Sequence, residues 1–231
     1  MAAKFIFGLI VILLLAGCAQ ETNSSDNVQN ISLTTDDSIK ISSRFYPGNQ
    51  TGIVLVHMLG RNKETWNAFA DELANSGYSV ISIDLRGHGE SGGSDYSSFS
   101  EAQWNSAVND IKAAKEFLKE KGATNFYIIG GSIGSNLAIK YAATDSDISK
   151  VVLLSPSFDY RGVKTEEAAE NFKGELLVVS SSEDLQSFGA SEQLAEISPN
   201  GEFVGLSGAG HGTNMLGKQN VNITILDFFS E

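Results

Sequence analysis

The chain has 231 residues, of which 42% are hydrophobic, and this length and composition suit one domain with a sizeable core. The formal net charge is −12, which argues against a nucleic-acid partner because phosphate binding draws on clustered Lys and Arg. One cysteine excludes an internal disulfide, and the three histidines are separated in sequence rather than clustered as metal ligands. We therefore expect no metal and no cofactor.

The first residues have the form of an export signal. Lys4 precedes the apolar run Phe5–Leu15, which is too brief to span a bilayer comfortably and is typical of a secretory signal. Leu15–Cys18 reads Leu-Ala-Gly-Cys and resembles the lipobox of prokaryotic lipoproteins, in which cleavage precedes a lipidated cysteine. We predict a signal peptide over residues 1–17, lipidation of Cys18, and an exported domain anchored at the cell membrane, outside the cytoplasm. An uncleaved membrane anchor is the alternative.

A polar segment follows this cysteine. Gln20–Asn30 is almost free of large apolar residues and cannot bury enough surface to fold, so we predict a tether over residues 18–30 and a folded domain over residues 31–231.

Within the predicted domain, apolar runs typical of strands alternate with patterns typical of helices. This alternation indicates a mostly parallel sheet with helices on both faces, preceded by one antiparallel strand. The expected strands are Ile39–Tyr46, Gly52–His57, Tyr78–Leu85, Asn125–Ile129, Val151–Leu154, Glu175–Ser180 and Glu202–Leu206. The expected helices are Trp66–Ser76, Glu101–Lys121, Ser132–Ala143, Ser187–Ile197 and Asn220–Phe229, the last of which would also suit a strand.

One predicted strand-to-helix turn carries a candidate nucleophile. Gly130–Gly134 reads Gly-Gly-Ser-Ile-Gly and fits the G-x-S-x-G pattern, in which a serine occupies a sharp turn. The flanking glycines are needed there because a Cβ would clash with the neighbouring strand and helix. Ser132 would then stand at the positive N-terminus of a helix, where developing negative charge is favoured.

Three motifs that follow predicted strands resemble those of the α/β-hydrolase family. His57–Gly60 occupies the position of the oxyanion loop, Arg86–Ser91 resembles the R-G-x-G-x-S turn, and Gly130–Gly134 resembles the nucleophile elbow. The resemblance covers nearly all of Ile39–Glu231 and implies an α/β-hydrolase fold. Its cap domain would be minimal or absent, since the segment Pro156–Gly174 is too short for a full lid.

The resemblance also implies a catalytic triad of Ser132, Asp184 and His211, in the chain order of this fold. His211 would take the serine proton, and Asp184 would orient the imidazole. Glu183 and Asp159 are the alternative acids.

The implied oxyanion hole consists of the backbone N–H groups of Leu59 and Ile133. The chain departs from the family at Met58, where glycine is usual, and a side chain there narrows the acyl pocket or shifts the loop. Met58 is therefore the second candidate donor. The two remaining histidines, His57 and His88, are expected to brace their loops by hydrogen bonds.

These residues predict a serine hydrolase that cleaves carboxylic esters, or thioesters, of small substrates through an acyl-enzyme on Ser132. A serine aminopeptidase-like amide hydrolase is the alternative within the enzyme class, and a non-catalytic binding module with the same fold is the alternative outside it. The expected partners are a small-molecule acyl substrate and the membrane, reached through the lipid anchor. The sequence leaves the oligomeric state and the acyl and leaving groups open.

Overall fold

The computed structural model describes residues 28–230. The predicted signal peptide, Cys18 and most of the predicted tether lie outside the described residues. The first strand, β1 (Gln29–Thr34), begins before the predicted domain start at Ile31 and pairs antiparallel with the next strand. The predicted tether therefore extends too far. β1 is an edge strand in which only Leu33 is buried, so it carries little of the apolar signal by which strands are recognised.

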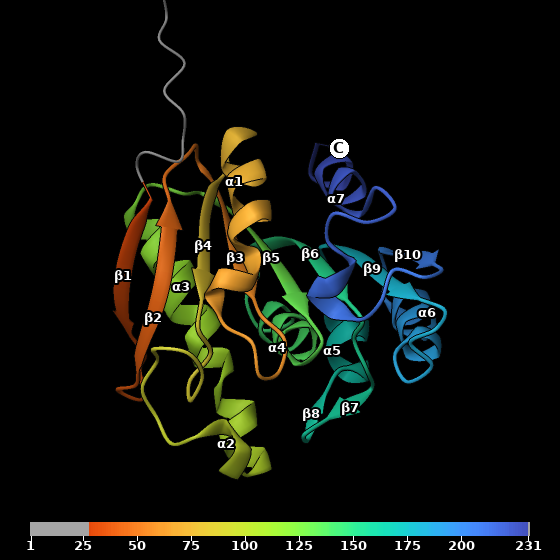
Figure 1. The fold of residues 1–231 in the computed structure, drawn as a ribbon, viewed down its shortest axis with the longest axis horizontal. Helices are drawn as coiled ribbons and strands as arrows, with labels where there is room; N and C mark the ends of the chain where they lie inside the picture. The colour runs from red at the N-terminus through yellow and green to blue at the C-terminus, as the bar shows by residue number, and fades with distance from the viewer. Residues whose placement is uncertain (1–27, 231) are drawn as a thin grey trace, which may run out of the picture.

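An eight-stranded sheet forms the centre of the domain (Figure 1), with strand order β1-β2-β4-β3-β5-β6-β9-β10. β2 runs antiparallel to both β1 and β4, and all neighbours from β4 to β10 are parallel. The predicted mostly parallel sheet is confirmed. The strands after β1 are β2 (Lys40–Tyr46), β3 (Thr51–Val56), β4 (Ser79–Ile83), β5 (Asn125–Gly131), β6 (Ile148–Leu154), β9 (Glu175–Ser181) and β10 (Gly201–Leu206).

Helices cover both faces of this sheet (Figure 1). One face packs against α3, α4, α5 and α6, and the other packs against α1 and α7. The α-helices are α1 (Asn67–Asn75), α2 (Glu101–Ser106), α3 (Val108–Glu120), α4 (Ile133–Ala142), α5 (Glu166–Asn171), α6 (Phe188–Ile197) and α7 (Val221–Ser230). The 3-10 helices within residues 28–230 are η2 (Lys63–Trp66), η3 (Tyr96–Ser98) and η4 (Gly212–Met215). None of the helices in residues 28–230 is long and apolar enough to cross a bilayer.

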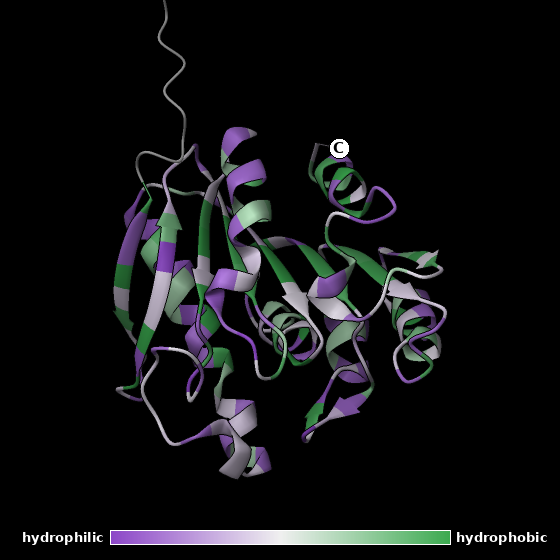
Figure 2. Ribbon diagram, in the orientation of Figure 1, coloured by the Kyte–Doolittle hydropathy of each residue, from purple (hydrophilic) through white to green (hydrophobic). Residues whose placement is uncertain are grey.

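The core lies on the two faces of the central strands. In β3, Val54 and Val56 belong to the cluster under α3 and α4, whereas Ile53 and Leu55 belong to the cluster under α1 and α7. Successive side chains of a strand point to opposite faces, so a strand that is covered on both sides reads as a continuous apolar run. Figure 2 shows these inner strands as largely hydrophobic, with hydrophilic residues on the outer surfaces of the helices.

The helix predicted over Glu101–Lys121 is in fact two helices, separated at Ala107. The guanidinium of Arg86 contacts both pieces: Nη1 donates to Ser106 Oγ at 2.8 Å, and Nε and Nη2 donate to Asp110 Oδ1 at 2.9 and 2.8 Å. The sequence around the break contains no glycine or proline, so its periodicity gave no sign of an interruption.

Between β6 and β9, the chain forms only a small excursion from the sheet. It consists of a two-stranded hairpin, β7 (Asp159–Tyr160) and β8 (Val163–Lys164), followed by α5, which packs against α4 and α6. This segment is too small for a cap domain.

Candidate active site

Ser132 lies on a strained turn between β5 and α4. Its backbone has φ 53° and ψ −120°, a region that non-glycine residues rarely adopt, and its N–H donates to Leu154 O at 2.8 Å. Because a strained backbone persists only where its surroundings hold it, this turn is fixed by the neighbouring strand β6. The serine is partly exposed at the carboxyl edge of the sheet.

Close packing explains the three glycines around this serine. A Cβ on Gly130 would lie 2.3 Å from Gly134 O, and one on Gly134 would lie 2.4 Å from Val56 O. A Cβ on Gly131 would lie 2.9 Å from Thr213 Cγ2. Distances under 3.0 Å leave no room for a side chain, so each glycine lets a different neighbour approach the turn.

His211 and Asp184 meet above the same edge of the sheet. The imidazole Nδ1 lies 2.6 Å from Asp184 Oδ2, and the two side chains are 40% and 12% exposed. An ionised carboxylate only accepts hydrogen bonds, so Nδ1 carries the proton and Nε2 presents a lone pair. His211 is thereby set up to accept a proton at Nε2.

The residue after His211 brings this pair up to the serine. A Cβ on Gly212 would lie 3.6 Å from Ser132 N and 3.7 Å from Ser132 Cβ, so Gly212 lies close to the turn that carries the serine. The Gly212 N–H also donates to Ser155 Oγ at 3.0 Å. Within the described residues, Ser132 Oγ and the imidazole share no hydrogen bond; in substrate-free enzymes this bond is often long and shortens when substrate binds.

The other two predicted acids do not contact His211. Asp159 is exposed on the β7–β8 hairpin, where its Oδ1 accepts from Gly162 N at 3.0 Å. Glu183 accepts hydrogen bonds from backbone N–H groups of the loop that carries His211. Of the three carboxylates, the structure pairs only Asp184 with the imidazole.

The predicted oxyanion donors are the N–H of Ile133 and one N–H of the loop after β3. Ile133 is the first residue of α4, so its N–H has no partner within the helix. In the loop after β3, Met58 O accepts a hydrogen bond from Arg61 N at 3.1 Å, which bends the backbone. Among residues 28–230, neither Met58 N nor Leu59 N donates a hydrogen bond to another backbone group. The choice between Leu59 and Met58 as the second donor therefore stays open, as it was in the sequence.

The side chain of Met58 packs beside the serine. Its Sδ accepts from Thr213 Oγ1 at 3.2 Å, and a Cβ on Gly212 would lie 3.0 Å from the same sulfur. This side chain, which stands where the family usually has glycine, therefore fills space between the loop after β3 and η4.

The two remaining histidines brace their loops, as predicted. His57 is fully buried, donates from Nδ1 to Met58 O at 2.9 Å and accepts at Nε2 from Leu85 N at 2.9 Å. His88 donates from Nδ1 to Arg86 O at 3.1 Å, and its ring stacks on the ring of Tyr96 with the two centroids 3.9 Å apart. His57 thus ties the oxyanion loop to the turn after β4.

Acidification is expected to destabilise the domain through His57. Burial lowers the pKa of its imidazole from 6.5 to about 4. Between these values the unfolded chain binds a proton that the folded chain does not, so His57's contribution to stability is complete above about pH 6.5 and is lost as the pH falls to 4. The difference corresponds to roughly 3 kcal/mol. Urea unfolding of the wild type and of His57→Gln from pH 7.5 to 4 should show the wild-type advantage shrinking by about this amount, whereas a constant difference would contradict it.

Sequence reasoning missed the buried Asp84, which lies directly after β4. Its carboxylate accepts from the backbone N–H and Nζ of Lys63 at 2.7 and 2.8 Å and from Glu90 N at 2.9 Å. A Cβ on Gly89 would lie 2.3 Å from Asp84 Oδ2, so the turn wraps closely around this carboxylate. Its position directly after an apolar strand run was the feature of the sequence from which a buried role for Asp84 could have been predicted.

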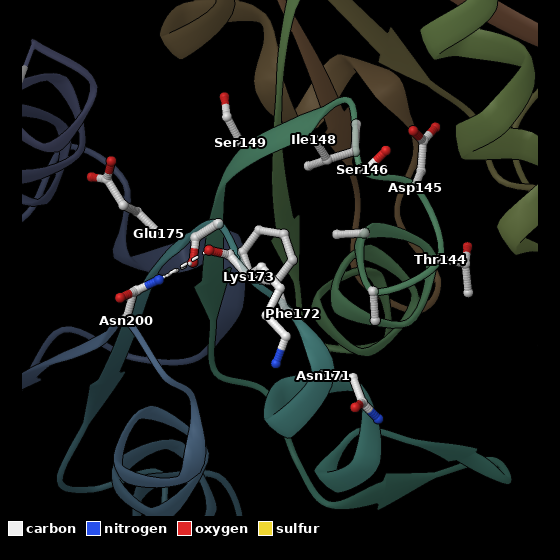
Figure 3. Close-up of a pocket in the computed structure, with 13 residues that line it drawn as sticks. Thr144, Asp145, Ser146, Ile148, Ser149, Asn171, Phe172, Lys173, Glu175 and Asn200 are labelled. Atoms are coloured by element: carbon white, nitrogen blue, oxygen red, sulfur yellow. Dashed lines mark hydrogen bonds between the residues drawn. The ribbon is translucent and has the colours of Figure 1, made fainter.

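Figure 3 shows a hollow that lies away from Ser132. It has a volume of about 720 Å³ and is lined by the ends of α4 and α5 and the starts of β6 and β9. Asn200 lies at one side of this hollow, where its Nδ2 donates to Lys173 O at 2.9 Å. Since parallel strands start at this edge and end at the other, the hollow is separated from the serine by the length of the sheet. Within residues 28–230, no group of His, Cys, Asp and Glu forms a metal-ligand set.

A mostly parallel sheet with a serine elbow after β5 and a histidine after β10 defines an α/β-hydrolase fold. A family model described as "Serine aminopeptidase, S33" (Hydrolase_4) matches residues 48–199, more than half of the chain. The chain therefore belongs to this family of α/β-hydrolases.

Solved structures of esterases share the fold. Esterase Pf2001 of Pyrococcus furiosus matches with a TM-score of 0.74 at 18% identity, over 88% of this chain and 92% of that one. Est1E of Butyrivibrio proteoclasticus, solved with ferulic acid, matches with a TM-score of 0.74 at 18% identity, over 87% and 98%. At such low identity, these likenesses show the fold alone.

Curated relatives match about half of the chain. Monoacylglycerol lipase abhd6-A of Xenopus laevis is 26% identical over 125 residues, which are 50% of this chain and 33% of the relative. The AB hydrolase superfamily protein YisY of Bacillus subtilis is 30% identical over 123 residues, which are 49% and 42%. The matches thus span less than half the length of these relatives.

Proposed function

We propose that the protein is a serine hydrolase that cleaves carboxylic esters of small substrates through an acyl-enzyme on Ser132. The observation that carries the proposal is the 2.6 Å hydrogen bond between His211 Nδ1 and Asp184, next to Gly212, where an added Cβ would lie 3.6 Å from Ser132 N. A serine on a strained turn, a base and an orienting carboxylate are the parts that acyl transfer requires.

In the proposed mechanism, His211 Nε2 takes the proton of Ser132 Oγ as the oxygen attacks the acyl carbon. The negative charge that develops on the acyl oxygen is stabilised by the N–H groups of Ile133 and of Leu59 or Met58. The carbon–oxygen bond to the leaving group then breaks, and His211 returns the proton to the departing alcohol. Water, deprotonated by the same imidazole, then attacks the acyl carbon. The bond from that carbon to Ser132 Oγ breaks, His211 returns the proton to Oγ, and the acid leaves, while Asp184 stabilises each imidazolium.

The choice of esters rests on relatives and on the shape of the site. The names of similar proteins, monoacylglycerol lipase and esterase, favour ester substrates. The family name, serine aminopeptidase, favours amides, and amide hydrolysis is therefore the second candidate.

Only the β7–β8 hairpin and α5 stand in the place of a cap, and Leu185, next to Asp184, is 86% exposed, so the site is open. An open site with Met58 beside the serine suits small or surface-presented acyl groups.

The membrane anchor remains a separate part of the proposal. Its support is the single cysteine placed directly after an apolar run, at Cys18. Two acyl chains on that cysteine would hold the domain firmly, since each buried CH₂ contributes about 0.8 kcal/mol.

Covalent labelling tests the proposed function. A fluorophosphonate probe is expected to label the purified protein, and Ser132→Ala is expected to abolish both labelling and hydrolysis of short-chain p-nitrophenyl esters. The matched control is Ser97→Ala, which changes an exposed serine in η3; this variant should be labelled to the same extent as the wild type. A folded wild type that neither labels nor hydrolyses esters, thioesters or aminoacyl amides would favour the non-catalytic binding module instead.

A further inference from the structure

The loop that carries His211 is built from residues that favour flexibility. Ser207–Gly212 reads Ser-Gly-Ala-Gly-His-Gly, and its three glycines have φ of 75°, 94° and 54°. Glycine adopts these left-handed conformations without strain, but it also loses the most conformational freedom on folding. An imidazole on such a loop keeps one position only where other groups hold the backbone.

Glu183 holds this loop at two points. Its Oε1 accepts from Gly210 N at 2.7 Å, and its Oε2 accepts from Gly208 N at 2.8 Å, so the carboxylate bridges the residues on either side of Ala209. Ser181 Oγ donates to Glu183 Oε2 at 2.6 Å and itself accepts from Ala209 N at 3.0 Å. Three consecutive backbone N–H groups are thus bound by one short turn after β9.

The charge of Glu183 strengthens these bonds. Hydrogen bonds from Ser181, Gly208 and Gly210 lower the pKa of its carboxyl group to about 2, so the group is ionised throughout the neutral range. Hydrogen bonds to an ionised acceptor are shorter and stronger than those between neutral groups.

The same turn also supplies the residue that orients the imidazole. Asp184 directly follows Glu183 and binds His211 Nδ1, while Glu183 binds the backbone one and three residues before His211. On the other side, Gly212 N is bound by Ser155 Oγ. The side chain of His211 and the backbone on both sides of it are therefore fixed by separate groups.

We propose that Glu183 is a positioning residue, which fixes the loop of His211 so that the imidazole stays aligned between Asp184 and Ser132. This inference rests on the proposed function, because it assigns Glu183 a role toward the proposed base. A misplacement of about 1 Å in a reacting group can cost about 10²-fold in rate, so the loop need not unfold for activity to fall.

The test compares Glu183→Ala, Glu183→Gln and the control Glu192→Gln, which changes an exposed glutamate on α6. Glu183→Ala is expected to lower kcat for a p-nitrophenyl ester about 10- to 100-fold, with KM changed less than about twofold, since alignment of a base acts on the transition state. Glu183→Gln keeps one acceptor oxygen and should recover part of the loss. Glu192→Gln should match the wild type.

Counting active sites separates positioning from folding. The stoichiometry of fluorophosphonate labelling at completion gives the fraction of competent molecules, and kcat is then expressed per labelled site. The proposal expects a lower kcat per site and faster amide hydrogen exchange in residues 207–212 of Glu183→Ala. An unchanged kcat per site would overturn it, whether or not the number of sites falls. Activity that survives Ser132→Ala would instead overturn the proposed function itself.

Discussion

Replacing Asp184 by asparagine is expected to lower kcat about 10⁴-fold while the protein stays folded. The carboxylate accepts a hydrogen bond from His211 Nδ1 at 2.6 Å. An amide in its place can turn its NH₂ group toward the ring, which places the ring proton on Nε2 and leaves Nδ1 as the acceptor. An imidazole in that tautomer has no lone pair facing Ser132 and cannot take its proton.

The measurement is kcat for a p-nitrophenyl ester, with a thermal melt to show that each variant is folded. Asp159→Asn is the matched control, because Asp159 was an alternative acid in the sequence and in the structure bonds only within its own hairpin, to Gly162 N. It should hydrolyse the ester like the wild type. A large loss in Asp159→Asn together with full activity in Asp184→Asn would show that the loops rearrange in solution and that the acid is misassigned.

Replacing Gly134 by alanine is expected to destabilise the domain by about 3 kcal/mol and to abolish most of the activity. The added Cβ would lie 2.4 Å from Val56 O and 2.6 Å from His57 O, and both are backbone atoms that cannot rotate away. Relief of the clash requires α4 to move from the end of β3, which shifts Ser132 relative to the oxyanion loop.

Gly189→Ala provides the control for this substitution. Gly189 lies in α6, and a Cβ there would meet no atom within 4 Å, so alanine should be neutral or should stabilise the helix by about 0.5–1 kcal/mol. Urea unfolding gives the two free energies, and ester hydrolysis gives the activity. If both variants were as stable as the wild type, the contact between α4 and β3 would be looser in solution than the structure shows.

The central elements could be predicted because their signals are local. The run Ile53–Val56 is buried on both faces and reads as continuous apolar sequence, and the glycines at 130 and 134 mark the sharp turn around Ser132. The hydrogen bond between His211 and Asp184 joins the two residues that the family motifs implied. Their catalytic roles remain predictions until the variants are measured.

Other features could not be read from the sequence because they depend on partners far away in the chain. The interruption at Ala107 lies where Arg86 contacts both helices, and no residue near the break signals it. Glu183 was considered only as an acid, since nothing in its own segment indicates that its oxygens bind the backbone of Gly208 and Gly210. The strand β1 was missed because an edge strand buries few side chains.

The direction of β1 decides at which edge of the sheet the chain enters the folded domain. β1 and β4 both run antiparallel to β2, so β1 starts at the edge of the sheet where the parallel strands start, and Ser132 lies at the opposite edge. Were Cys18 lipidated as proposed, the tether would therefore join the folded domain at the edge of the sheet opposite to the one that carries Ser132, and the anchor would enter the domain away from the nucleophile.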